Sequence, residues 1–245
     1  MAFDPSKYGE DLADIYDLVY PATPEVSQAV DFVNGYCPEK GDILELGVGT
    51  GRLALPLAEL GHRVHGVDAS QKMLDKLVES DPDGTVETTL ADFSEVNLDQ
   101  EFDVVLIALN TFFMLPSQDL QIACLANAKK HLKEGGRLII EVYEPSRFHA
   151  IEGTDTQIQH LDPESVMINS IQVDRVNQIV AIGQILFRSG EMKKTPEISR
   201  YAWPAELDLM ARISGLTPSE RHENWLRYPF TQASPRHISV FTNDG

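Results

Sequence analysis

The stretch Leu44–Asp68, LELGVGTGRLALPLAELGHRVHGVD, decides the fold. A short apolar run leads into three glycines at alternate positions, Gly47, Gly49 and Gly51, and a second apolar run ends at Asp68. A strand, a glycine-rich turn, a helix and another strand are the repeating unit of a doubly wound parallel sheet. Because glycine has no Cβ, three of them in one turn predict that a ligand approaches the backbone closely.

The position of this turn indicates what the ligand is. In a doubly wound sheet the turn lies at the carboxyl end of the first strand, where such sheets bind ligands, and the next helix offers unpaired N–H groups. Asp68 ends the second strand about 20 residues further on, a position from which a carboxylate binds the two hydroxyls of a ribose. The two features predict a cofactor that contains a nucleoside.

Two details narrow the choice of nucleoside. Dinucleotide sites favour GxGxxG, whose spacing accommodates a pyrophosphate, whereas this turn reads GxGxG and follows Glu45. A carboxylate beside the turn disfavours pyrophosphate and suits an ammonium group. After the third expected strand, Asp92 and Phe93 offer a hydrogen-bond acceptor and an apolar edge to an adenine. The expected ligand has a ribose, an adenine and an amine, and no phosphate.

The first part of the chain alternates between expected strands and helices. Strands are expected at Asp42–Leu46, His62–Val67, Thr85–Leu90, Phe102–Ala108 and Arg137–Tyr143. Helices are expected at Asp11–Tyr20, Pro24–Tyr36, Gly51–Leu60, Gln71–Glu79 and Ser117–Leu132. This alternation predicts an α/β fold with a doubly wound, mostly parallel Rossmann-like sheet and helices on both faces.

The pattern changes after Pro145. Three β-rich segments follow with no room for crossover helices, so they predict an inserted antiparallel β cap: Ser165–Val173, Ile179–Ser189 and Ile198–Ala202. A helix after Pro204 and β segments at Ser219–Trp225 and His237–Thr242 would complete the main sheet. We therefore divide the chain into an N-terminal helical lid (1–40), a cofactor-binding core (41–144), the cap (145–202) and a C-terminal helix with strands (203–245).

Composition limits the possible partners and the location. The formal net charge of −18 disfavours binding to nucleic acid or to an anionic membrane surface. The longest apolar run, Val104–Leu109, is far shorter than a membrane span, and the acidic N-terminus lacks the apolar region of a signal peptide. Only two cysteines occur, Cys37 and Cys124, so a disulfide framework is not expected. These features predict a cytoplasmic protein.

Five stretches in order carry a resemblance to a known family: ILELGVGTGRLALPLAELG, VHGVDASQKML, LADF, FDVVLIALNTF and HLKEGGRLIIEVY. Over about residues 40–145 the chain resembles the class I S-adenosylmethionine-dependent methyltransferases. The helix ADIYDLVY is similar to the lid of sugar N,N-dimethyltransferases, and LNTFFML is similar to a segment of methyltransferases that modify peptide N-termini. The resemblance implies S-adenosylmethionine as the cofactor and a small molecule or peptide as the methyl acceptor.

The resemblance also implies roles for individual residues. Gly47, Gly49 and Gly51 would line the methionyl and ribose parts, Glu45 would support the amino group, and Asp68 would bind the ribose. The residues that would border the adenine are Ala69, Met73, Asp92 and Phe93. Those that would flank the sulfonium are Leu109 and Asn110, and the candidates for the methionyl carboxylate are Arg52 and Tyr16. Structural alternatives remain open: a loop cap for Asp92, a core position for Met73, a surface ion pair for Arg52 and aromatic packing for Tyr16.

Catalysis requires little beyond alignment, because the methyl group of a sulfonium is already activated. An amine acceptor must also lose a proton, which requires a base only if the amine arrives protonated. Tyr143, Glu144 and His149 follow the fifth strand, and we expect His149 as the first choice and Tyr143 as the second. A histidine titrates near neutral pH, although one in a loop can equally be a packing residue.

Several further possibilities remain open at this stage. No His, Cys or carboxylate cluster has metal-ligand spacing, so no metal site is expected. The methyl acceptor could be a nitrogen or an oxygen, and exposed edges of the cap could pair two subunits into a homodimer. The alternatives to a methyltransferase are an NAD-dependent oxidoreductase, which the glycine spacing disfavours, and a non-catalytic nucleoside-binding protein on the same fold.

Overall fold

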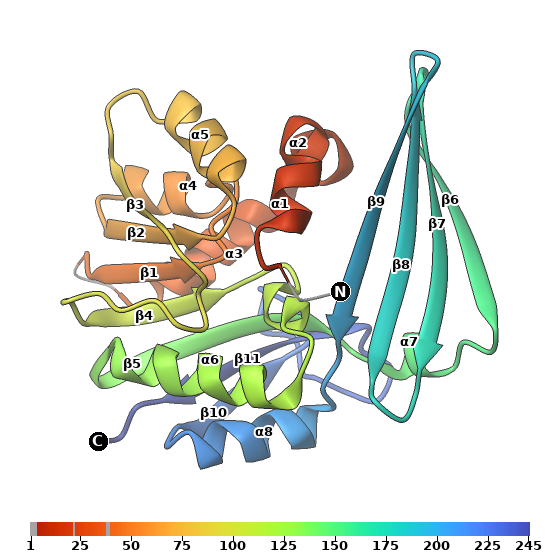
Figure 1. Cartoon of the computed structure of the whole chain (residues 1–245). Coiled ribbons are helices and arrows are strands. Elements are labelled where there is room, and N and C mark those ends of the chain that lie inside the picture. Colours follow the sequence, from red (N-terminus) through yellow and green to blue (C-terminus); the bar gives the residue numbers. More distant parts are fainter. Residues whose placement is uncertain (1–3, 22, 38–39) are drawn as a thin grey trace.

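The computed structural model describes residues 4–21, 23–37 and 40–245, and it contains two separate sheets (Figure 1). The larger sheet has the strand order β10-β11-β5-β4-β1-β2-β3. Its strands are β1 (Asp42–Leu46), β2 (Arg63–Asp68), β3 (Val86–Leu90), β4 (Phe102–Ile107), β5 (Leu132–Tyr143), β10 (Thr217–His222) and β11 (Arg236–Thr242). The five strands from β5 to β3 pair in parallel, and β11 pairs antiparallel with β5 and β10. The expected doubly wound, mostly parallel sheet is confirmed.

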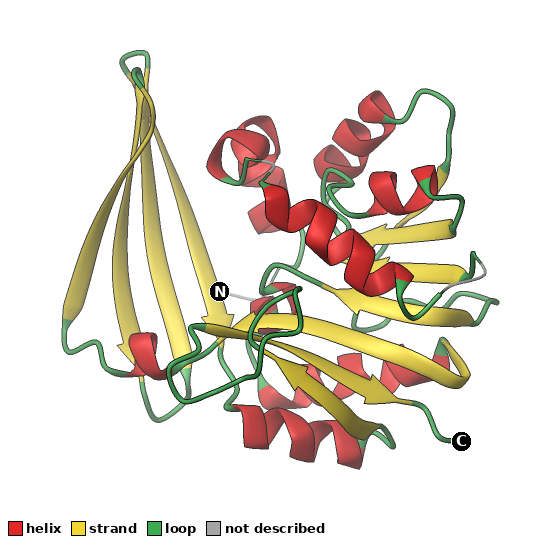
Figure 2. Ribbon diagram, turned by 180° about the vertical axis from the view of Figure 1, so that it is seen from behind, coloured by secondary structure: helices red, strands yellow, loops and turns green. Residues whose placement is uncertain are grey.

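Helices cover both faces of this sheet. They are α3 (Pro24–Asn34), α4 (Ala54–Glu59), α5 (Gln71–Ser80), α6 (Gln118–Lys130) and α8 (Pro204–Ile213). Side chains of α3, α4 and α5 share one apolar cluster with the sheet, and those of α6 and α8 share another. In Figure 1 α6 lies in front of the sheet, and Figure 2 shows the opposite face with α3 lying across it. Strands β1 and β4 are buried almost throughout because both of their faces are covered, and apart from Glu45 of β1 their central residues are apolar.

The second sheet is antiparallel and has the order β6-β7-β8-β9. Its strands are β6 (Thr154–Asp162), β7 (Ser165–Asp174), β8 (Ile179–Arg188) and β9 (Glu191–Arg200). Both views show it standing beside the main sheet, with its β9 edge nearest the N-terminal helices (Figures 1 and 2). The expected antiparallel insertion is confirmed, and β6 is a strand that the sequence analysis missed. The four-part division of the chain itself stays a prediction.

The expected N-terminal helix is wrong as a single element. The segment forms three short turns, α1 (Lys7–Leu12), η1 (Ala13–Ile15) and α2 (Tyr16–Val19), because Leu12 and Ile15 have φ angles of −102° and −127° that interrupt helical hydrogen bonding. Leu12 and Val19 pack against Met73 of α5 and against Met167 and Leu186 of the second sheet. The N-terminal turns therefore connect the two sheets.

Several other boundaries differ from expectation. The segment expected at Ile198–Ala202 belongs to β9, which begins at Glu191 and ends at Arg200. Helix α4 begins at Ala54 and not at Gly51, because Gly51 has φ +86° and cannot belong to a right-handed helix. Strand β5 begins at Leu132 and not at Arg137. Phe102 of β4 pairs with Leu132 and Val104 pairs with Arg137, so β5 has a bulge between these two pairs. Strand β10 covers Thr217–His222, which is earlier than expected.

Within the described ranges, no helix is both long and apolar enough to span a membrane.

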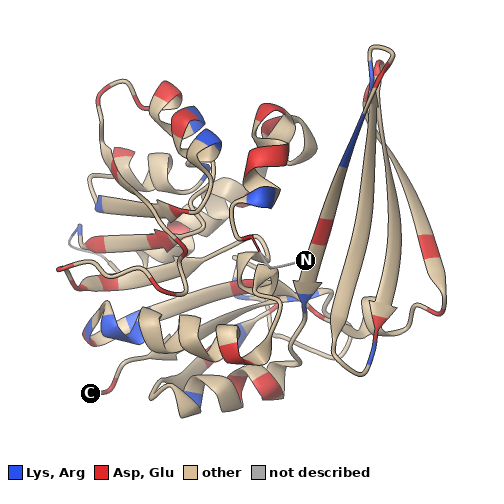
Figure 3. Cartoon of the chain, viewed as in Figure 1, with Lys and Arg blue, Asp and Glu red and all other residues tan. Residues whose placement is uncertain are grey.

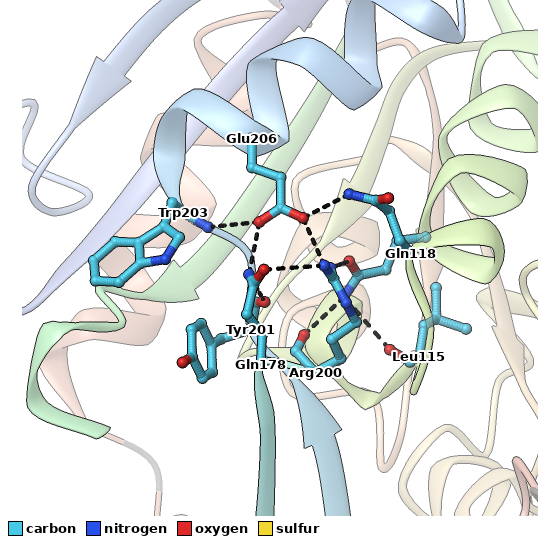
Figure 4. A network of polar contacts seen from close by, with 8 residues as sticks. Leu115, Gln118, Gln178, Arg200, Tyr201, Trp203 and Glu206 are labelled. Carbon is cyan, nitrogen blue, oxygen red and sulfur yellow. Dashed lines mark hydrogen bonds and ion pairs between the residues drawn. The ribbon is translucent and has the colours of Figure 1, made fainter. Parts of the chain in front are cut away.

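A partly buried polar network joins the end of β9 to helices α6 and α8 (Figure 4). The Arg200 side chain is 9% exposed and lies 2.6 Å from Glu206 Oε1 at the start of α8. Its guanidinium also donates to Gln121 Oε1 of α6 at 2.7 Å and to Gln178 Oε1 at 3.3 Å. The side-chain amides of Gln118 and Gln178 also donate to the Glu206 carboxylate, each at 2.7 Å. The network sets where the second sheet stands relative to the core.

Candidate active site

One cavity of about 280 Å³ lies where the two sheets meet. Its floor consists of the carboxyl ends of β1, β2 and β5 and the loop after β4, which includes the 3-10 helix η2 (Thr111–Met114). The N-terminal turns α1 and α2 form one wall, and the facing side of β7, β8 and β9 forms the other. The cavity therefore has a half built by the glycine turn and a half built by the second sheet.

The Asp68 carboxylate accepts hydrogen bonds from the backbone of the glycine turn and of Ser70. Gly49 N donates to Asp68 Oδ2 at 2.9 Å and Ser70 N donates to Asp68 Oδ1 at 2.9 Å, while burial raises the pKa of this carboxyl. Gly47 and Gly49 have φ angles of +79° and +56°, which favour glycine. A Cβ at Gly49 would meet no described atom within 4 Å, whereas one at Gly47 would lie 2.3 Å from Thr111 Cγ2. Gly49 therefore presents bare backbone to the cavity.

The expected adenine contacts divide into two groups. Ala69, Met73 and Phe93 line the cavity next to Asp68. Asp92 is outside the lining, and its Oδ1 accepts hydrogen bonds from Ser94 N at 2.8 Å and Ser94 Oγ at 2.7 Å. This is the loop-cap geometry that was the structural alternative for Asp92, so its adenine contact stays a prediction.

Glu45, Gly51 and Arg52 also lie outside the cavity lining. Burial raises the pKa of Glu45 to about 8, and its Oε2 has no hydrogen-bond partner among the described residues. The Arg52 guanidinium donates to Pro21 O at 3.2 Å, beside the N-terminal turns. Tyr16 does line the cavity, and burial raises its pKa far above the usual value. Glu45 and Arg52 thus lie behind the lining, and their expected cofactor roles stay predictions.

Leu109 and Asn110 line the cavity in a strained loop after β4. Both are non-glycine residues in the left-handed region, with φ angles of +51° and +64°. The loop is fixed by Glu141, whose Oε2 accepts from Leu109 N at 3.1 Å, and by Asn110 Oδ1, which accepts from Tyr143 N at 2.7 Å. Residues in such backbone conformations cluster at functional sites.

The two catalytic candidates lie in different places. Tyr143 lines the cavity between the rings of Phe113 and Phe148, at centroid distances of 4.9 and 4.6 Å. Its hydroxyl has no partner within the described part of the chain, and burial raises its pKa. His149, at the end of α7 (Ser146–His149), is outside the lining and forms a 2.7 Å hydrogen bond between its Nδ1 and the Tyr201 hydroxyl. The structure does not bring His149 to the cavity. Of the two candidates, only Tyr143 is placed where it could contact a methyl acceptor.

The second sheet supplies polar residues that the sequence analysis missed. Asn169 of β7 pairs with Gln184 of β8, and Gln184 Nε2 donates to Glu197 Oε2 of β9 at 3.1 Å. All three side chains line the cavity, and Asn169 Oδ1 and Gln184 Oε1 have no hydrogen-bond partner among the described residues. Each of these strands also carries apolar residues, and Val180 and Ile182 of β8 line the same cavity, so no repeating polar pattern marks the three residues in the sequence. Their shared direction can be read only once the register is known.

The N-terminal wall is aromatic. Tyr8 and Tyr20 share a hydrogen bond of 3.0 Å between their hydroxyls, and the Tyr16 and Tyr20 rings lie 5.0 Å apart. Thr50 Oγ1 in the glycine turn donates to Asp17 Oδ1 of α2 at 3.0 Å. The N-terminal turns are thus attached to the glycine turn.

No group of three or more His, Cys, Asp or Glu side chains that could hold a metal occurs in the described ranges.

Comparison with known proteins decides the family. A methyltransferase domain model matches residues 43–136, which include the glycine turn, Asp68 and the loop after β4. The cypemycin N-terminal methyltransferase of Streptomyces sp is 33% identical over 239 residues, covering 97% of this chain and 98% of that protein. The chain belongs to the methyltransferase family.

Solved structures support the same conclusion. The CcbJ methyltransferase from Streptomyces caelestis superposes with a TM-score of 0.91 at 36% identity, covering 98% of this chain and 99% of that one. An S-adenosylmethionine-dependent methyltransferase from Clostridium acetobutylicum shares the fold, with a TM-score of 0.85 at 20% identity over 96% and 98% of the two chains. These comparisons give no support to an NAD-dependent oxidoreductase.

This methyltransferase is S-adenosylmethionine-dependent, and its cavity fits that cofactor. Gly49 leaves room for a ligand against the backbone, Asp68 keeps lone pairs free for a ribose, and Met73 and Phe93 offer apolar surface to an adenine. Glu45 lies behind the lining, and burial raises its pKa to about 8, so its expected support of the amino group stays a prediction. The structure thus brings together most, but not all, of the residues expected from the sequence.

Proposed function

We propose that this enzyme transfers the methyl group of S-adenosylmethionine to a nitrogen of a small molecule or of a peptide terminus. The supporting observation is that one cavity joins the glycine turn and Asp68 to a polar surface on the second sheet. The 33% identical relative is named the cypemycin N-terminal methyltransferase. An oxygen acceptor is the runner-up.

The chain's own residues would bind, orient and enclose the reactants. S-adenosylmethionine supplies an activated methyl group when it is bound. Asp68, Gly47 and Gly49 would hold the nucleoside, and Leu109 and Asn110 would fix the reacting end through their rigid loop. The tyrosines of the N-terminal turns and the rings around Tyr143 would exclude water, so that alignment provides most of the rate enhancement.

The charge of the chain supports the proposed partners. Acidic side chains number 38 against 20 basic ones, and in the view of Figure 3 Lys and Arg lie in small separate groups. We therefore infer that nucleic acid and membranes are not partners, and that the enzyme works in the cytoplasm. Strand β6 is an edge strand of the second sheet, and a homodimer could form by pairing there.

The test follows a ¹³C-labelled methyl group from S-adenosylmethionine to a panel of acceptors. The panel contains short peptides with free N-termini, amino sugars, and the same molecules with the amine acetylated or replaced by a hydroxyl. We expect labelled product only from free amines, with the ¹³C shift of an N-methyl group. Label that appears only in hydroxyl compounds would replace the nitrogen acceptor with an oxygen acceptor.

A further inference from the structure

The half of the cavity built by the second sheet presents hydrogen-bond acceptors. Gln184 Nε2 donates to Glu197, which fixes the amide so that Gln184 Oε1 is the atom left over. That oxygen and Asn169 Oδ1 are buried without partners among the described residues, as is the Tyr143 hydroxyl. Buried polar atoms without partners are rare in native proteins, so these atoms indicate a polar ligand. The ligand must bring donors, because two of these atoms can only accept.

The charge of the cavity points the same way. Its described lining contains two carboxylates, Asp68 and Glu197, and no Lys, Arg or His. Asp68 already accepts from Gly49 and Ser70 in the glycine turn, whereas Glu197 accepts only from the neutral amide of Gln184 among the described residues. Glu197 is half-buried on β9, so its charge has little solvent to stabilise it. A cationic group on the ligand would compensate the charge of the Glu197 carboxylate, which no cationic side chain of the described lining does.

We propose that Glu197 binds the protonated amine of the methyl acceptor and takes up its proton, with Gln184 and Asn169 accepting the other N–H groups. This inference rests on the proposed function and adds to it that the acceptor enters as an ammonium ion. An ammonium group has three donors and no acceptor, which matches the three side chains side by side across β7, β8 and β9. A hydroxyl acceptor would leave two of these oxygens without a donor.

The proton balance gives Glu197 its role. An N–H bond of the ammonium breaks, an O–H bond forms on the Glu197 carboxylate, and the nitrogen keeps the electron pair with which it attacks the methyl carbon. The methylated nitrogen carries a positive charge again, so each turnover releases one proton. Glu197 loses that proton to solvent when the product leaves, and the carboxylate is restored for the next acceptor.

The protonation behaviour of the surrounding groups is consistent with this role. Burial raises the pKa of Glu197 to about 7, which lets the carboxyl hold or release a proton near neutral pH. The titratable groups that face it are Tyr8 on α1, Tyr20 after α2 and Tyr143 on β5, and burial raises the pKa of each. All three tyrosines are neutral from pH 5 to 9. Glu197 alone then titrates on this side of the cavity.

The experiment measures binding of simple probes to the enzyme saturated with S-adenosylhomocysteine, so it does not depend on knowing the natural acceptor. Benzylamine is the cationic probe and benzyl alcohol its neutral counterpart, and both are titrated by NMR or calorimetry. Glu197→Gln keeps the shape of the side chain and removes the charge. Glu191→Gln, at the exposed start of the same strand, is the matched control.

We expect the wild type and Glu191→Gln to bind benzylamine at least tenfold more tightly than benzyl alcohol. Glu197→Gln should lose roughly tenfold to a hundredfold in benzylamine affinity, as for a hydrogen bond to a charged group, and keep its S-adenosylhomocysteine affinity. Wild-type affinity for benzylamine should fall below about pH 7 as Glu197 is protonated, and that fall should be absent in Glu197→Gln.

Equal binding of the two probes, no binding of either, or undiminished benzylamine binding by Glu197→Gln would overturn the inference. Its failure can be told apart from failure of the proposed function. If Glu197→Gln transfers labelled methyl groups to nitrogen as fast as the wild type, the role of Glu197 is wrong and nitrogen methylation stands. If the wild type labels only oxygen, the proposed function is wrong.

Discussion

Asp68 has a structural role in the glycine turn, and we propose a binding role for the same side chain. Its two oxygens accept from Gly49 N and Ser70 N, and the residue also lines the cavity. Asp68→Ala should weaken S-adenosylhomocysteine binding by about 1.5–3 kcal/mol, the usual contribution of hydrogen bonds to a charged group. Calorimetric titration measures this loss, and Asp75→Ala, exposed on the next helix, is the control that should bind normally.

The thermal midpoint of Asp68→Ala distinguishes the two roles. Loss of the acceptor for two backbone N–H groups should lower it modestly, while the buried apolar core stays intact. An unchanged affinity together with a collapsed midpoint would mean that Asp68 only holds the glycine turn.

Local chemistry explains which site residues the sequence could predict. Gly47, Gly49 and Asp68 are close in sequence and act through one turn, so their spacing alone indicates the site. Glu197 and Gln184 face the cavity only through the register of β8 against β9, which spacing does not determine. His149 follows the fifth strand as expected, but its ring is hydrogen-bonded to Tyr201, which lies 52 residues away along the chain.

At the scale of elements, the joint between β9 and the helices of the core can be tested. Arg200 is the cation that neutralises Glu206, and both side chains are largely buried. Removing one partner of a buried ion pair leaves the other charge without compensation, so Arg200→Met should lower the free energy of unfolding by about 3 kcal/mol. Denaturant titration measures this change. Arg188→Met, at the exposed end of β8, should cost less than about 0.5 kcal/mol.

A second substitution tests the mechanism of that loss. Because the cost comes from an isolated carboxylate, Arg200→Met combined with Glu206→Gln should recover part of the lost stability. If the double variant is as unstable as the sum of the two single variants, the pair does not act as a unit.

Element prediction failed where tertiary contacts override local pattern. Strand β6 has the sequence TDTQIQHLD, with few apolar residues, and it is a strand because β7 pairs along its length. The N-terminal segment reads as one helix, yet its turns separate to place tyrosines over the cavity while Leu12 packs below. Strands β1 and β4 were predicted well because burial on both faces favours mostly apolar sequences.

For the whole molecule, the site lies at the seam between two sheets. The main sheet contributes the glycine turn, Asp68 and the loop after β4, and the second sheet contributes Asn169, Gln184 and Glu197. The N-terminal turns and the Arg200 network both contact the two sheets and fix their relative position. Such a division would let changes in the second sheet alter the choice of acceptor without changing the cofactor site.

A crystal structure of the complex with S-adenosylhomocysteine tests this account most directly. We predict the ribose hydroxyls within hydrogen-bond distance of the Asp68 carboxylate, the adenine against Met73 and Phe93, and the sulfur directed toward the part of the cavity that Tyr143 and Glu197 line. The nucleoside bound away from the glycine turn, or with its sulfur directed away from the second sheet, would contradict the account.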